Sequence, residues 1–176
     1  TSIPAYDLTL DLSEGYFKYR ELPLAVEHIA ATFNSACKTG KPKDLDFALQ
    51  QLKATIGKGL IEGNLSVKGL KKTAVKADLK ANLQLDDLAR TIPIKDYAFG
   101  GALNATLKAE GRLELDQQQF PAATGALQLK NGRLQTPWYP HPIENLEIAA
   151  NLKSNSYRDL ALSLQPVAFV FEAQPF

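Results

Sequence analysis

The sequence predicts an all-β or β-dominated fold: a long, curved antiparallel sheet that forms an open groove, with one or two short helices. Two stretches carry this prediction, Val75 to Leu85 and Leu103 to Leu115, in which apolar and polar residues alternate. Successive side chains of a strand point to opposite faces, so each stretch has one apolar and one polar face. In a helix the same apolar residues would lie on two roughly opposite sides, which argues for strands.

The composition is that of an ordinary globular chain. Of 176 residues, 45% are hydrophobic and 22% are charged, so disorder is not expected. The net charge of +1 argues against a nucleic-acid partner held by phosphate attraction. No run approaches the roughly 18 apolar residues of a membrane-spanning helix. No signal peptide is recognised in the sequence. Because it opens at Thr1 without an initiator Met, we expect residues 1–176 to be one β-rich segment of a larger protein.

In the first third of the chain, Tyr6 to Leu12 alternates cleanly and predicts a strand. Ser13 to Gly15 is a turn signal, after which Tyr16 to Tyr19 is predicted to return as a second strand. Leu24 to Phe33 fits either a helix or a strand. Residues 34–43 are predicted to form a loop that contains the single cysteine.

Further along, alternation after residue 44 slips in phase at Gln50-Gln51, which predicts a bulge or a bend. Asp86 to Arg90 has the acidic start of a single helical turn, which Pro93 keeps short. Gly100-Gly101 predicts a hinge or turn. The last third contains five short strand-like segments: Ala126–Leu129, Arg133–Gln135, Leu146–Leu152, Leu160–Leu164 and Val167–Phe171.

The two ends of the chain echo each other, over about residues 8–56 and 125–171. A set of apolar, Gly and Pro positions recurs 117 residues later, Leu10 becoming Leu127. The set is Leu10, Leu12, Gly15, Phe17, Pro23, Val26 and Ile29. Leu45–Gln50 then echoes Leu160–Gln165, displaced by 115 residues. Since the second copy alternates, we interpret Leu24 to Phe33 as a strand. Repetition of this kind is typical of architectures that grow by adding units, so further strands are expected downstream.

Several motifs resemble the C-terminal part of AsmA-like proteins. The first runs Leu127-x-Leu129-x-x-Gly132-x-Leu134, followed by Pro140 to Pro142-Ile143-x-Asn145-Leu146. The others are Leu83-x-Leu85-Asp86-Asp87-Leu88, Gly111-Arg112-Leu113 and the closing Val167 to Phe176. The likeness covers most of the chain. It consists of the spacing of apolar residues and of a few Gly and Pro positions.

The resemblance implies a periplasmic segment of a Gram-negative envelope protein whose parent is anchored in the inner membrane. AsmA-like proteins are similar to TamB and to the repeating β-groove proteins that move lipids between membranes. The implied partner is a phospholipid or another acyl lipid, and the implied role is lipid transport and outer-membrane maintenance. Contact with the membrane itself would come through parts of the parent missing from this sequence.

An apolar sheet face suits this role, because keeping acyl chains away from water is worth about 0.8 kcal/mol per CH₂. The predicted lipid-lining residues are Val75, Leu79, Leu83, Leu85, Leu103, Leu107, Leu113 and Leu115. Lys71 and Lys72, in a cluster with three further lysines, are predicted to contact anionic headgroups, unless this cluster is only a solvated face. The alternative is a closed core, in which a facing sheet completes a β-sandwich and the edge strands dock a protein partner.

Catalytic chemistry is not expected. His28 and His141 are the only histidines, and neither has Cys, His or carboxylate neighbours at ligand spacing. Cys37 is alone and cannot form an internal disulfide. No GxSxG, HExxH or CxxC motif occurs. We therefore expect no enzyme, no metal and no cofactor.

Overall fold

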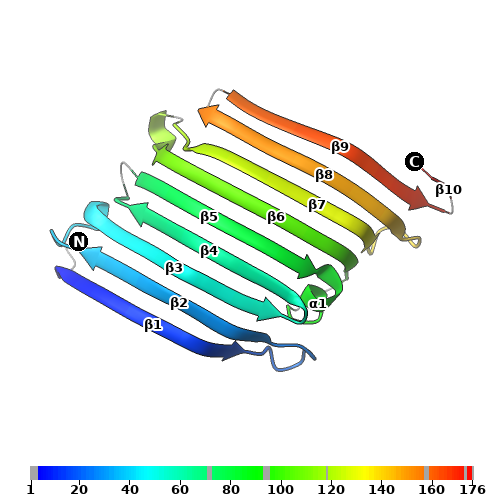
Figure 1. Cartoon of the computed structure of the whole chain (residues 1–176), viewed down its shortest axis with the longest axis horizontal. Coiled ribbons are helices and arrows are strands. Elements are labelled where there is room, and N and C mark those ends of the chain that lie inside the picture. The colour runs from blue at the N-terminus through cyan, green and yellow to red at the C-terminus, as the bar shows by residue number, and fades with distance from the viewer. Residues whose placement is uncertain are drawn as a thin grey trace.

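The computed structural model describes residues 4–70, 73–92, 96–117, 119–156, 159–172 and 174–175. They form one antiparallel sheet that is not closed, and its strands follow the order of the sequence (Figure 1). The predicted fold class is confirmed. The strands are β1 (Tyr6–Phe17), β2 (Val26–Cys37), β3 (Leu45–Ile56), β4 (Gly59–Lys68), β5 (Thr73–Gln84), β6 (Ala98–Leu113), β7 (Ala122–Gln135), β8 (Ile143–Ser156), β9 (Asp159–Phe171) and the two-residue β10 (Gln174–Pro175).

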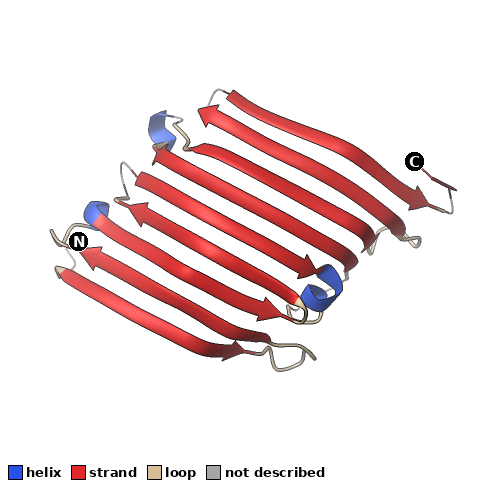
Figure 2. Cartoon of the chain, in the orientation of Figure 1, coloured by secondary structure: helices blue, strands red, loops and turns tan. Residues whose placement is uncertain are grey.

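The sheet is a single layer. Each strand from β2 to β9 pairs with the strand before it and the strand after it, and no helix or second sheet lies along the described strands (Figure 2). Among the described residues, the short α-helix α1 (Leu85–Ala89) and the 3-10 turns η1 (Pro42–Asp44) and η2 (Leu115–Gln117) lie at strand ends. The backbone ladder between sequence neighbours is therefore the main support of the fold.

Several strands carry one extra residue at a β-bulge, and these bulges bend the sheet (Figure 1). Glu14 on β1, His28 on β2 and Gln51 on β3 all have positive φ at the point where the register shifts. The predicted irregularity at Gln50-Gln51 is confirmed. On β7 and β8, Asn131 and Asn145 occupy bulges of the same kind.

The register of the sheet repeats along with the sequence. β1 pairs with β2 as Leu12↔Ala31, Gly15↔Ile29 and Phe17↔Val26. β7 pairs with β8 as Leu129↔Ile148, Gly132↔Leu146 and Leu134↔Ile143, each position displaced by 117 residues. The pairing of β2 with β3 recurs in that of β8 with β9, for example Val26↔Ile56 as Ile143↔Phe171, displaced by 117 and 115 residues. The two hairpins thus share their pairing and the positions of their bulges.

Two predicted turns are wrong. Ser13 to Gly15 does not reverse the chain, because Glu14 adopts φ 54° and its extra residue is absorbed as a bulge within β1. Gly100-Gly101 lies inside β6, where Gly101 has φ 112° and packs against the backbone of β7 at Lys130 to Gly132. In both places a glycine signal marks a distortion of a continuous strand. The interpretation of Leu24 to Phe33 as a strand is confirmed from Val26 onward.

The two long stretches end earlier than predicted. β5 stops at Gln84, and Leu85 begins α1, in agreement with the predicted helical turn at Asp86. β6 stops at Leu113, and Leu115 begins η2. In each case the apolar alternation runs one leucine beyond the strand. The acidic residues that follow, Asp86-Asp87 and Asp116, favour a helical turn there.

Several of the few buried side chains lie where α1 caps one end of the sheet. Asp87 Oδ2 accepts a hydrogen bond from the Lys58 backbone N–H, and Asp86 Oδ2 accepts one from Gly101. The β1–β2 connection reaches the same end, since the Leu24 N–H donates to the Arg90 carbonyl. Near this junction Ala25, Ile56, Leu83 and Thr91 are buried.

Cys37 is not in a loop, as predicted, but is the last residue of β2. Its thiol is fully buried and donates a hydrogen bond to the Lys41 carbonyl. The predicted loop starts four residues too early, because residues 34 to 37 continue the ladder with β1 and β3.

Gly63 provides a test of this architecture. It has φ 152°, and a Cβ there would lie 2.2 Å from the Asp78 carbonyl oxygen of β5. Gly63→Ala is expected to lower the free energy of unfolding by about 1–3 kcal/mol, measured by chemical denaturation. Ser66→Ala on the same strand is the control and should change stability little. Equal stabilities of the two variants would contradict the described path of β4.

Candidate functional site: the apolar face of the sheet

Apolar side chains line up in rows across the strands. Leu83 lies directly opposite Leu103, and Leu103 opposite Leu129. A second row runs through Leu79 and Leu107. A third row has one apolar side chain from each of β1 to β7 and ends at Ser154 on β8: Leu10, Phe33, Leu49, Leu65, Ala77, Ala109 and Ala123. The alternation seen in the sequence therefore builds one continuous face.

Most of this face is bare. The chain exposes 11886 Å² of surface, roughly two-fifths more than the about 8,500 Å² expected for a globular protein of 19.3 kDa. Large side chains remain accessible at both edges and in the middle, for example Leu10 at 59%, Leu107 at 37% and Leu162 at 60%. A monomer rarely exposes contiguous apolar patches of this kind unless something binds there.

Most of the predicted lining residues share this face. Val75 and Leu79 on β5, and Leu103, Leu107 and Leu113 on β6, are half-buried or exposed, and the β5–β6 register keeps them on one side. Leu107 is the most accessible of the five. The structure thus brings these residues together as one surface, without a covering layer among the described residues.

The remaining predicted site residues differ. Leu83 lies on the same face but is only 6% exposed, because the chain covers it near α1. Leu85 and Leu115 lie outside the strands, in α1 and η2, so their predicted place in the strand face is wrong. Lys71 and Lys72 fall outside the described residues.

The predicted set also misses much of the face. The outer strands contribute apolar side chains that are more accessible than those of β5 and β6. For β1, the alternation of Leu8, Leu10 and Leu12 in the sequence could have indicated them. The additional exposed residues are Leu8, Leu10, Leu12, Phe17, Leu127, Leu162, Leu164 and Val167.

The opposite face is polar and carries charge pairs across neighbouring strands. Lys76 lies opposite Glu110 with 3.4 Å between Nζ and Oε2, and Lys108 lies opposite Asp78 at 3.4 Å. Lys80 lies opposite Glu62 at 3.9 Å. All these side chains are largely solvated, so each pair contributes little stability but favours the observed register.

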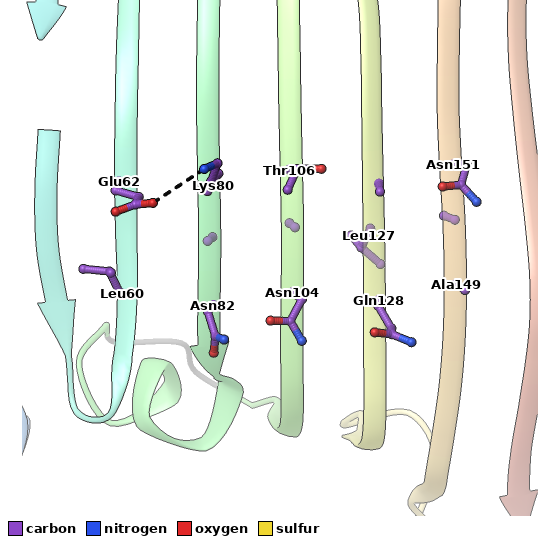
Figure 3. A pocket seen from close by; sticks show the side chains of 14 residues that line it. Leu60, Glu62, Lys80, Asn82, Asn104, Thr106, Leu127, Gln128, Ala149 and Asn151 are labelled. Carbon is purple, nitrogen blue, oxygen red and sulfur yellow. Dashed lines mark ion pairs between the residues drawn. The ribbon is translucent and has the colours of Figure 1, made fainter. Parts of the chain in front are cut away.

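A hollow of about 520 Å³ lies on this polar face and spans β4 to β8 (Figure 3). Its walls are two rows of side chains, one with Asn82, Asn104 and Gln128 and the other with Glu62, Lys80 and Thr106. Between the rows, the floor is made by small residues such as Ala81 and Ala105, whose side chains belong to the apolar face. The hollow is open, and it does not belong to the apolar surface.

Exposed aromatic residues gather at the loop between β7 and β8. The ring of Trp138, which is 78% exposed, meets that of Tyr97 edge-on at 5.6 Å. The Tyr139 hydroxyl donates a 2.7 Å hydrogen bond to Glu172 Oε1, and this bond raises the pKa of Tyr139. Desolvation and the negative charge of Glu172 act in the same direction. The contact ties the β7–β8 loop to the end of β9.

Each histidine lies beside a carboxylate. His28 Nδ1 is 2.8 Å from Glu14 Oε2, joining the bulges of β1 and β2, and His141 Nε2 is 3.9 Å from Glu172. Among the residues that the structure describes, no group of three or more His, Cys, Asp or Glu side chains is arranged to hold a metal ion.

Comparison of the chain with protein-family models, with curated proteins and with solved structures found no match. The AsmA-like resemblance therefore stays a prediction. In the described part of the chain, no helix has the length and apolarity needed to cross a membrane.

The charge pairs of the polar face can be tested by reversal. Lys76→Glu places two carboxylates directly opposite each other and is expected to lower the free energy of unfolding by about 0.2–1 kcal/mol. The double variant Lys76→Glu, Glu110→Lys should recover most of this loss. The difference should shrink in high salt because exposed charges are screened. A double variant as unstable as the single one would contradict the register between β5 and β6.

Proposed function

We propose that the apolar face of this sheet shields the acyl chains of phospholipids, as a segment of an AsmA-like envelope protein in the periplasm. The observation that carries the proposal is the single layer: a continuous apolar face that the described residues leave uncovered. The AsmA-like resemblance in the sequence supports the same role, with the parent protein anchored in the inner membrane and acting in outer-membrane maintenance.

The energetics favour an apolar ligand over bare contact with water. Burying a fully exposed Leu side chain gains about 1.5–3 kcal/mol. Leu107, Leu127 and Leu164 are exposed by 37%, 39% and 51%, so covering each of them gains a fraction of this amount. Acyl chains are flexible and bind without fixed polar partners, so they fit a long face on which apolar side chains predominate. A face of this kind binds lipid through the total apolar area that the lipid covers, and not through a specific pocket.

The shape of the sheet also suits a ligand that moves. Apolar rows continue from one strand to the next without a wall between them, as in the row through Leu10, Leu65 and Ala123. The many alanines in the middle strands, among them Ala77, Ala81 and Ala105, keep the face smooth. A lipid can therefore shift along the rows while its acyl chains stay covered.

Leu107→Asp tests the proposal, with Thr106→Asp as its matched control on the same strand. A carboxylate at Leu107 lies on the apolar face and should reduce phospholipid co-purification several-fold, because a charge beside acyl chains is strongly unfavourable. Thr106 lies on the polar face and is exposed, so its variant should retain lipid. Native mass spectrometry and lipid extraction measure the bound phospholipid, and circular dichroism checks the fold.

Leu107 is preferable to Leu83 for this test, because Leu83 is buried and an aspartate there would disturb the fold. Equal lipid loading of the folded Leu107→Asp and Thr106→Asp variants, or no lipid in the unsubstituted chain, would contradict the proposal.

A further inference from the structure

We propose that the hollow on the polar face, which spans β4 to β8, binds an extended, uncharged glycan of β-1,4-linked N-acetylhexosamine units. This goes beyond the proposed function, since it concerns the face opposite to the apolar one. The hollow measures about 520 Å³, within the range of about 300–1,000 Å³ typical of ligand sites in proteins. It is built by strands in the interior of the sheet, so its walls do not depend on an edge strand.

Four side-chain amides of the hollow have no partner in the sheet. Asn82, Asn104 and Gln128 lie directly opposite one another on β5, β6 and β7 and form the first row (Figure 3). Asn151 lies on β8 in the second row. All four are exposed, and none makes a side-chain hydrogen bond with another residue in the described part of the chain. Each amide therefore offers two N–H donors and a carbonyl oxygen to a ligand.

Two asparagines of the same face outside the hollow show the contrast. Asn34 Oδ1 accepts a 2.9 Å hydrogen bond from the Thr9 hydroxyl. Asn64 Oδ1 accepts one, also 2.9 Å long, from the Gln51 backbone N–H. These amides support the sheet itself, whereas those of the hollow remain available.

The charges of the hollow favour an uncharged ligand. Lys80 and Glu62 are the ionisable residues among those that line it, and they face each other with 3.9 Å between Nζ and Oε1. The first row ends in the apolar side chains of Leu60 and Ala149. Neutral hydrogen-bonding groups beside small apolar contacts match a sugar, which presents hydroxyls around apolar C–H groups.

The spacing of the side chains favours a glycan chain over a peptide. The two rows lie two residues apart along each strand, about 6.6–6.8 Å, and enclose a slot that runs across the strands. Along the slot, wall positions recur at the strand spacing of about 4.7–4.9 Å. Sugar units of an extended β-1,4-linked glycan repeat at close to this distance. Residues of an extended peptide repeat at about 3.3 Å and fall out of step.

An N-acetyl group fits the amides better than a hydroxyl does. Its N–H and C=O can pair with the carbonyl and the NH₂ of one side-chain amide, which gives two hydrogen bonds at one strand. Successive units of a β-1,4-linked glycan are turned over, so their acetamido groups face the two rows in alternation. Gln128 in the first row and Asn151 in the second lie on neighbouring strands, as two successive units require.

NMR titration of the isotope-labelled chain with chitotetraose tests the proposal. The side-chain NH₂ signals of the hollow, each assigned from the corresponding Ala variant, are expected to shift saturably, while that of Asn34 stays in place. Cellotetraose lacks acetamido groups, and maltotetraose is curved by its α-linkages. Both should bind about tenfold more weakly, as the loss of one or two hydrogen bonds implies.

Gln128→Ala should weaken chitotetraose binding about tenfold for the same reason. Thr124→Ala is its matched control, on the same strand and face but outside the hollow, and should bind like the unsubstituted chain. Circular dichroism checks that both variants fold. No saturable shift in the hollow, equal affinity for the three tetrasaccharides, or equal affinity of the two variants would overturn the proposal. Lipid binding by the apolar face is unaffected by either result.

Discussion

The fold depends on backbone pairing between strands that are neighbours in sequence, because a single layer has no second sheet to support it. Hydrogen bonds of the ladder and the side-chain pairs beside them must therefore specify the register strand by strand. Directly opposed residues such as Lys76 and Glu110 on the polar face, and Leu79 and Leu107 on the apolar face, agree on one alignment. The bulges then bend this ladder at set points without breaking it.

The same constraint produces the exposed apolar face. In most globular proteins the apolar side of a sheet is covered by another layer. Here α1 and the β1–β2 connection cover only one end, where Ile56 and Leu83 are buried. Elsewhere most large side chains of the rows stay accessible, and the middle strands carry small Ala residues where a packed core would carry large ones. The proposed lipid ligand supplies the missing apolar cover.

Much of the fold can be predicted from the sequence, since unbroken alternation over ten or more residues, as in β5 and β6, fits only a strand. Local signals are less reliable. Ser13 to Gly15 has the composition of a turn, yet Glu14 only inserts a residue, and its repeat counterpart Asn131 does the same within β7. Leu85 and Leu115 continue the alternation although the chain has already turned into α1 and η2. Alternation also cannot tell a bare face from a covered one, so neither the burial of Leu83 nor the exposure at the edges could be predicted.

Fluorescence quenching by phospholipids that carry a spin label on the acyl chain tests the central claim most directly. A fluorophore is attached to a cysteine placed at Leu127 in one variant and at the adjacent Gln128 in another, while the buried Cys37 stays unlabelled. The two side chains lie on opposite faces of β7, Gln128 in the wall of the polar hollow. The account predicts strong quenching at position 127 and weak quenching at position 128. Equal quenching at the two positions, or stronger quenching at 128, would contradict it.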